Sequence, residues 1–211
     1  TIYLGVISAE TTKRNEGIEH VDLDAAEANM RKVVELAGGR PVTYFGARHW
    51  TFREDAAISL AAYKGGATGC STDVGAATFG QKGQGTIPHA LENIYAWKCG
   101  KRNAVVEATL AFDRVIAPEI PRVALIDYDN RELTDSLAVA KALKGRLAAV
   151  RVDTCGENVA QGAVPNPDSP EAEQWVAAGR PLPRRDDPLA KFWFGKGVTV
   201  TGVYELRKAL D

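Results

Sequence analysis

The sequence has few cysteines, no excess of charge of one sign and no long hydrophobic run. Its three cysteines, Cys70, Cys99 and Cys155, are odd in number and include no CxxC pair. This pattern argues against a disulfide framework and against a structural zinc site. It is typical of a reducing compartment, so we expect a cytoplasmic protein.

The balance of charge and the short apolar runs also exclude some partners. The chain has 26 basic and 27 acidic residues and a formal net charge of -1, so no global field favours nucleic acid or a membrane surface. The apolar opening at 2–7 is far shorter than the ~18 residues that a membrane span needs, and it lacks the basic flank of a signal peptide. Any anionic ligand must therefore be held locally.

What the chain does contain is enough apolar residues for a sizeable core. It is 45% hydrophobic and 25% charged over 211 residues, which suits one domain or a large piece of one. Short apolar runs alternate with helical stretches. This alternation predicts βα units around a parallel sheet.

The first half of the chain predicts two helices and two strands. The stretch 24–37 has apolar residues at helical spacing; Asp24, with a glutamate three residues on, matches a capping box, and Gly38 offers a stop. Thr51 starts a second capping-box pattern before another helix. Short apolar runs predict strands at 42–45 and 67–70.

The second half continues the alternation. Pro88 suits the first position of a helix, because its fixed φ is helical and its missing N–H costs nothing there, so His89 should lie in a first turn. Further elements are predicted as a helix near 103–115, a strand at 122–126, a helix ending at Gly145 and a strand at 147–152.

The organisation predicts one α/β domain with a long insertion. We place a barrel-like core at 1–155, a proline-rich loop at 156–198 with six of the ten prolines, and a C-terminal helix of the same domain at 199–211. Loops of this length are usually functional or mobile. A parallel barrel that ends on a helix after too few strands is incomplete, so we expect an incomplete (β/α) barrel from a partial chain.

Four motifs carry polar side chains just beyond predicted strands or at a helix start. They are FGARH at 45–49, GTIPHA at 85–90, LIDYD at 125–129 and VRVDT at 150–154. Their order and spacing resemble the nicotinate phosphoribosyltransferase family, above all its compact archaeal and bacterial members. That family is related to the nicotinamide and quinolinate phosphoribosyltransferases. The likeness runs from about residue 35 to 155 and over the last helix.

This resemblance implies both a fold and a reaction. The fold is that of type II phosphoribosyltransferases, an incomplete α/β barrel beside a mixed domain, usually in a homodimer with shared active sites. The reaction joins nicotinate to phosphoribosyl pyrophosphate and gives nicotinate mononucleotide and pyrophosphate in NAD biosynthesis. ATP hydrolysis is coupled to it through a phosphorylated histidine.

The carboxylates and arginines of the motifs suit this chemistry. Displacing pyrophosphate builds positive charge on the ribose and negative charge on the leaving group, and Asp127 and Asp153 can bind Mg²⁺ or ribose hydroxyls. A guanidinium grips a carboxylate through two parallel hydrogen bonds, so we assign Arg48 to nicotinate and Arg151 to pyrophosphate. Further substrate-binding candidates are Phe45, His49, Thr86 and Thr154.

His89 is the candidate for the phosphorylated histidine. An imidazole must be neutral to accept a phosphoryl group. We expect the partial positive charge of a helix N-terminus to disfavour the imidazolium and to stabilise the phosphohistidine, by ~0.3 to 2 kcal/mol. His89, Asp127 and Asp153 are thus the predicted catalytic residues.

Other readings remain open at this point. The chain has Thr68 where many members of the family have an aspartate near the pyridine, so a nicotinamide or quinolinate phosphoribosyltransferase is an alternative. A non-catalytic fragment or pseudo-enzyme that binds pyridine nucleotides is another. An aldolase-like barrel with Lys64 as Schiff base has little support, because Lys64 lies at a helix end beside two glycines.

Overall fold

The computed structural model describes residues 13–15, 17, 20–46, 50–184 and 186–211. The chain forms two compact units, Thr1–Gly85 and Thr86–Asp211, and each is considered separately. The sequence had placed 1–155 in one core, whereas the division between the units falls inside that range. Among the described residues, no helix is both long and apolar enough to cross a membrane.

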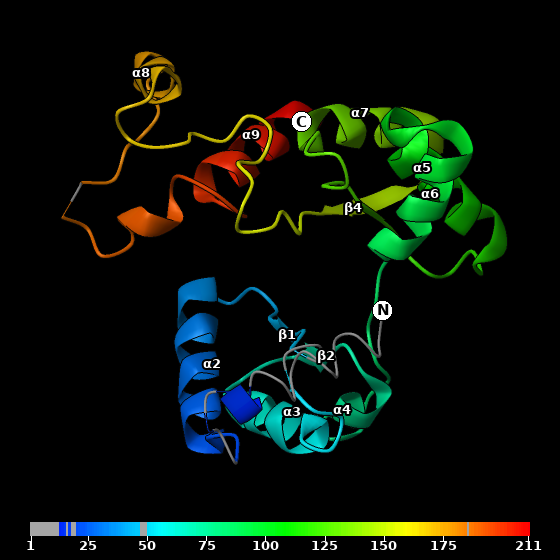
Figure 1. The fold of residues 1–211 in the computed structure, drawn as a ribbon, viewed down its shortest axis with the longest axis vertical. Helices are drawn as coiled ribbons and strands as arrows, with labels where there is room; N and C mark the ends of the chain where they lie inside the picture. Colours follow the sequence, from blue (N-terminus) through cyan, green and yellow to red (C-terminus); the bar gives the residue numbers. More distant parts are fainter. Residues whose placement is uncertain (1–12, 16, 18–19, 47–49, 185) are drawn as a thin grey trace. The chain divides into compact units, whose positions relative to one another are not determined.

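The first unit contains one parallel strand pair with a helical crossover (Figure 1). Its elements are α2 (Leu23–Ala37), β1 (Thr43–Tyr44), α3 (Asp55–Lys64), β2 (Gly69–Cys70) and α4 (Asp73–Ala77). Ile58 and Ala62 of α3 and Cys70 of β2 are fully buried. The predicted strands 42–45 and 67–70 are therefore present but shorter.

The start of α2 differs from the prediction, while its end agrees. The capping residue is Asp22, whose carboxylate accepts a hydrogen bond from the backbone N–H of Ala25 at 2.8 Å. Asp24 lies inside the first turn, so the capping box expected there is wrong. Gly38 has a φ of 58° and closes the helix in the left-handed conformation, as predicted.

The second predicted capping box is also wrong. Helix α3 begins at Asp55, and its capping residue Glu54 makes no side-chain capping bond. The Thr51 hydroxyl donates to the Glu54 carboxylate at 2.9 Å, and Lys13 Nζ donates to the same group at 2.7 Å. The Glu54 carboxylate thus contacts Thr51 and Lys13, and the helix starts one residue after it.

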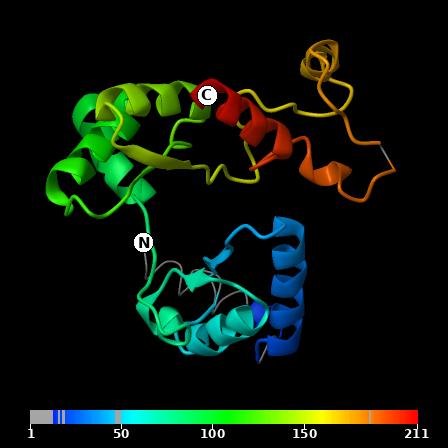
Figure 2. The same cartoon turned by 180° about the vertical axis from the view of Figure 1, so that it is seen from behind.

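The second unit repeats the same plan with longer strands. Its elements are α5 (His89–Cys99), α6 (Lys101–Val115), β3 (Arg122–Leu125), α7 (Glu132–Leu143), β4 (Leu147–Arg151), α8 (Pro170–Ala177), the short 3₁₀ helix η1 (Ala190–Phe192) and α9 (Val200–Leu210). Strands β3 and β4 pair in parallel, with Leu125 opposite Arg151. Helix α7 is the crossover between them, and α9 packs beside α7 (Figure 2).

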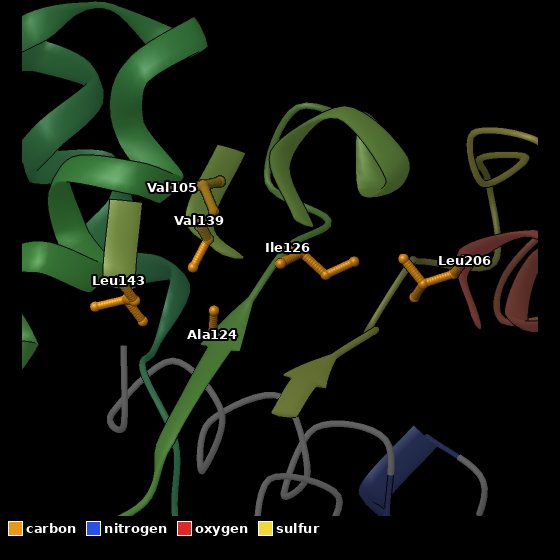
Figure 3. Packing of buried hydrophobic residues seen from close by; sticks show 6 residues of the cluster. All are labelled: Val105, Ala124, Ile126, Val139, Leu143 and Leu206. Atoms are coloured by element: carbon orange, nitrogen blue, oxygen red, sulfur yellow. The ribbon is translucent and has the colours of Figure 1, made fainter. Parts of the chain in front are cut away.

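A cluster of apolar residues joins β3 to the helices around it (Figure 3). Its members come from α6, β3 and the residue after it, α7 and α9: Val105, Ala124, Ile126, Val139, Leu143 and Leu206. Residues 124–126 are at most 1% exposed, as expected for a parallel strand covered by helices. This packing fixes the place where the chain leaves β3.

The segment 156–198 is more ordered than the sequence indicated. It contains α8, where Ser169 accepts a hydrogen bond from the N–H of Ala172 and Pro170 occupies the first turn. Trp175 of α8 is buried against Val164 and Ala172. The sequence analysis missed this helix because it took the prolines as a sign of a loop. A proline at the first position of a helix favours the helix instead. The final helix, predicted within 199–211, is present as α9.

The described residues therefore form a mixed α/β fold with two short parallel strand pairs. They contain no closed barrel. The prediction of βα units is confirmed, while the incomplete barrel stays a prediction.

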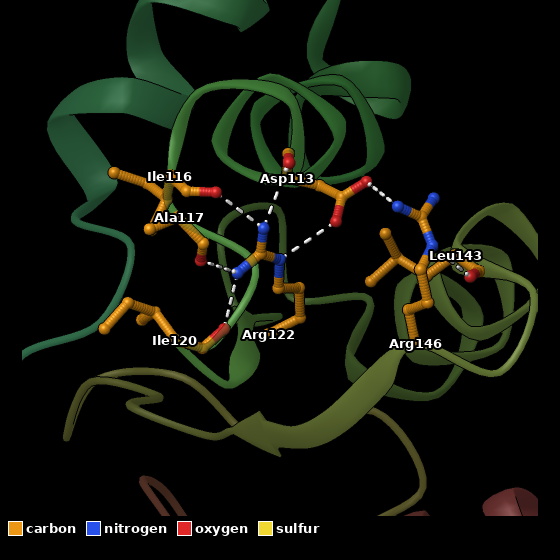
Figure 4. A network of polar contacts seen from close by, with 7 residues as sticks. All are labelled: Asp113, Ile116, Ala117, Ile120, Arg122, Leu143 and Arg146. Atoms are coloured by element: carbon orange, nitrogen blue, oxygen red, sulfur yellow. Dashed lines mark hydrogen bonds and ion pairs between the residues drawn. The ribbon is translucent and has the colours of Figure 1, made fainter.

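Arg122, at the start of β3, binds the C-terminal end of α6 (Figure 4). Its guanidinium donates to the carbonyls of Asp113, Ile116, Ala117 and Ile120 and to the Asp113 carboxylate. The residue is 7% exposed. One side chain thus satisfies helix-end carbonyls that have no partner inside the helix.

We predict that Arg122→Ala lowers the free energy of unfolding by about 2 to 4 kcal/mol, because several part-buried carbonyls lose their donor together. Urea unfolding measures this. The control is Arg114→Ala at the same helix end, an exposed residue whose loss should change stability by under about 0.5 kcal/mol. Equal effects of the two substitutions would contradict this role of Arg122.

Candidate active site

The parallel pairing of β3 and β4 brings two of the predicted motifs to one edge. The ladder continues past Leu125, since the N–H of Ile126 donates to the carbonyl of Arg151 at 3.2 Å. Asp127 follows β3 by two residues and Asp153 follows β4 by two residues. Both aspartates therefore leave the carboxyl end of the strand pair, where α/β folds carry their chemistry.

Helix α5 supplies a histidine to this edge. His89 is the first residue of α5, and its Nε2 lies 3.0 Å from Oδ2 of Asp127. Pro88 is the capping residue and has an extended conformation. It was predicted at the first helical position, which His89 occupies instead. The Tyr128 hydroxyl also donates to Asn93 Oδ1 at 2.8 Å and holds α5 to the residues after β3.

The pKa of His89 shifts in the direction opposite to the expectation. The hydrogen bond to the Asp127 carboxylate raises the pKa of His89, and burial opposes this rise only in part. The helix N-terminus was expected to keep the imidazole neutral, but a carboxylate at hydrogen-bond distance outweighs a partial charge. When the ring is neutral, Asp127 favours the proton on Nε2 and leaves the lone pair on Nδ1.

Arg151 is held in place by two neighbours. Its Nη1 donates to the Thr86 hydroxyl at 2.7 Å, and its Nη2 donates to Asp153 Oδ2 at 2.6 Å. The side chains of Arg151 and Asp153 are 28% and 37% exposed. The guanidinium is thus oriented and still accessible to an anion.

Glu92 belongs to the same region and was missed by the sequence analysis. It lies one helical turn after His89 in α5, is 0% exposed, and neither carboxylate oxygen has a hydrogen-bond partner among the described residues. Burial raises the pKa of Glu92 to about 8. Its spacing of three residues from His89 could have indicated the shared helix face.

Thr154 has an internal partner. Its hydroxyl donates to Glu132 Oε1 at 2.8 Å, and Glu132 Oε2 accepts from the N–H of Gln161 at 2.8 Å. Both Thr154 and Glu132 are buried. These bonds fasten the segment after β4 to the start of α7, so the predicted substrate contact of Thr154 would require its bond to Glu132 to open.

The pyridine-binding candidates belong to the first unit. Arg48 and His49 lie outside the described residues. Phe45 directly follows β1 and is 44% exposed. Thr68 donates its hydroxyl to the Val42 carbonyl at 3.2 Å. Lys64 is exposed at the end of α3 and lacks the burial that a Schiff-base lysine needs.

Asp127 and Asp153 are the two carboxylates considered as ligands of a metal ion. In the described part of the chain, no group of three or more His, Cys, Asp or Glu side chains is placed to hold a metal ion. Mg²⁺ often uses only one or two carboxylates and takes its other ligands from water and substrate phosphates. Oδ1 of Asp127 is buried and has no hydrogen-bond partner among the described residues, so it could serve as a ligand. The magnesium site at Asp127 and Asp153 stays a prediction.

No protein-family model and no curated protein matches the chain. A solved structure does: nicotinate-nucleotide pyrophosphorylase from Pyrococcus furiosus, at 35% identity and a TM-score of 0.55. The match covers 63% of this chain and 32% of that one, so the chain spans about a third of the solved structure. The chain thus resembles an enzyme of the phosphoribosyltransferase class in both sequence and fold.

We predict that Asp127→Asn lowers the pKa of His89, because the carboxylate that stabilises the imidazolium is lost. Ring proton shifts in an NMR titration report this directly. Tyr128→Phe is the control, since it removes only the bond to Asn93 and should leave the His89 titration in place. An unchanged pKa in Asp127→Asn would mean that the two side chains are not paired in solution.

Proposed function

We propose that the complete protein is a pyridine phosphoribosyltransferase that makes nicotinate mononucleotide and pyrophosphate from nicotinate and phosphoribosyl pyrophosphate. The observation that carries the proposal is the set of polar contacts at the carboxyl end of β3 and β4. There His89 pairs with Asp127, and Arg151 pairs with Asp153. The similar solved structure, a nicotinate-nucleotide pyrophosphorylase, supports the phosphoribosyltransferase class.

The charges suit the departure of pyrophosphate from ribose. Arg151, oriented by Thr86 and Asp153, would bind the anionic leaving group. Asp127 and Asp153 provide fixed negative charge for the ribose as positive charge develops on it. Mg²⁺ held by these two carboxylates would supply further positive charge to the pyrophosphate.

ATP coupling rests on His89. In the tautomer that Asp127 favours, the lone pair on Nδ1 attacks the γ-phosphorus of ATP; the N–P bond forms as the bond from phosphorus to the ADP oxygen breaks. Asp127 stabilises the positive charge that develops on the ring. The name of the solved structure does not mention ATP, and the phosphohistidine rests on the pair of His89 with Asp127.

The substrate test uses the complete protein with phosphoribosyl pyrophosphate, Mg²⁺ and one pyridine at a time, with and without ATP. Mass spectrometry should detect nicotinate mononucleotide, and ATP should raise its yield. Carbon dioxide release from quinolinate, or product only from nicotinamide, would select one of the related enzymes instead. No product from any pyridine would favour a non-catalytic binding protein.

We predict that Arg48→Ala weakens the binding of nicotinate much more than that of nicotinamide. An ion pair at ~4 Å is worth roughly 4 kcal/mol at an effective dielectric near 20, before desolvation is subtracted, and only nicotinate carries the carboxylate. Calorimetry with both ligands measures the difference. Unchanged nicotinate affinity in the variant would remove Arg48 from the pyridine site.

We predict that His89→Ala abolishes ATP hydrolysis and leaves a slow transfer that does not depend on ATP, because Asp127, Arg151 and Asp153 remain. Labelling with γ-phosphate-labelled ATP should give an acid-labile product in the natural protein and none in the variant. His20→Ala is the control and should label normally. Undiminished labelling of His89→Ala would refute the assignment.

A further inference from the structure

Glu92 is a buried carboxyl group to which the proposed reaction assigns no role. Its side chain is fully buried, and both carboxylate oxygens lack a hydrogen-bond partner among the described residues. An ionised carboxylate in such a place loses its hydration without compensation, which is among the most costly arrangements in a protein interior. A protonated carboxylic acid avoids most of that cost.

Four charged groups on different elements influence the charge of Glu92. His89 of α5 and Arg151 of β4 favour the ionised form, while Asp127 after β3 and Asp135 of α7 oppose it. Asp135 is itself buried. Its Oδ2 has no hydrogen-bond partner within the described ranges, and Nη2 of Arg131 lies 3.5 Å from its Oδ1. Burial is the largest influence on Glu92, and it acts in the same direction as the two aspartates.

We propose that Glu92 is a positioning residue that stays protonated one turn below His89 and so leaves Asp127 as the only carboxylate paired with the imidazole. This rests on the proposed function for the role of His89. Asp127 and Asp153 already raise the pKa of His89, and a neutral Glu92 adds no further anion that would hold a proton on the ring or repel an incoming phosphate. Burial of the group, with a pKa near 8, agrees with a proton retained at neutral pH.

The proposal has a consequence for stability that needs no catalysis. The folded protein keeps the Glu92 proton up to about pH 8, whereas the unfolded chain releases it near the ordinary value of 4.5. The folded state therefore binds more protons in this window, and the contribution of Glu92 to stability falls as pH rises from about 4.5 to 8 and is level above it. Glu92→Gln, a neutral isostere, removes this dependence.

The first experiment measures urea unfolding of the complete protein and of Glu92→Gln from pH 5 to pH 9. Relative to the variant, the unfolding equilibrium constant of the natural protein should rise roughly tenfold per pH unit between pH 5 and 8. Glu119→Gln, at an exposed position, is the control and should follow the natural protein throughout. Parallel curves for Glu92→Gln and the natural protein would overturn the proposal.

The second experiment follows His89 phosphorylation against pH. Glu92→Gln should label within about threefold of the natural protein at pH 7 and should keep its rate above pH 8, where the natural protein declines. A purely structural glutamate would give the same profile shape in both proteins, and that result would reject the link to His89. If the natural protein does not label at all, the proposed function fails, while the unfolding measurement still decides whether Glu92 is protonated.

Discussion

The parallel pairing of β3 with β4 is the constraint on which the candidate site depends. The strands can lie side by side because α7 crosses between them and buries Val139 and Leu143 against Ala124 and Ile126. Parallel strands end at the same edge, so residues that follow them are brought together although 26 positions separate Asp127 from Asp153. Arg122 fixes the other end of β3 to α6 through helix-end carbonyls.

The chemistry of this edge is a balance of a few charges. One carboxylate, Asp127, is paired with His89, and another, Asp153, is paired with Arg151. A third, Glu92, is buried and has no hydrogen-bond partner in the described part of the chain, and burial raises its pKa. The partners of His89 and Arg151 fix their orientation, and the guanidinium of Arg151 is part-exposed.

The sequence predicted those parts of the fold that depend on local pattern. Apolar runs located β3, β4 and the helices between them, and the strand ends located Asp127 and Asp153. Capping was predicted poorly, because Asp22 and Asp24 are both plausible caps and only the backbone conformation decides between them. Helix α8 was missed because prolines were read as loop residues.

The sequence predicted which residues belong to the candidate site better than it predicted their pKa values and pairing. The GTIPHA and LIDYD motifs identified His89 and Asp127, but only coordinates show that they touch and that the carboxylate raises the histidine pKa. Glu92 carries no motif of its own. Its importance comes from complete burial, which depends on long-range packing that one helix segment does not specify.

The central claim is that the edge formed by Asp127, Arg151 and Asp153 binds the phosphoribosyl group. The most direct measurement is a crystal structure of the complete protein with nicotinate mononucleotide, pyrophosphate and Mg²⁺. We expect the ribose beside Asp127 and Asp153 and pyrophosphate oxygens within hydrogen-bond distance of Arg151. A nucleotide bound elsewhere, with the pairs of His89 with Asp127 and of Arg151 with Asp153 unoccupied by ligand, would contradict it.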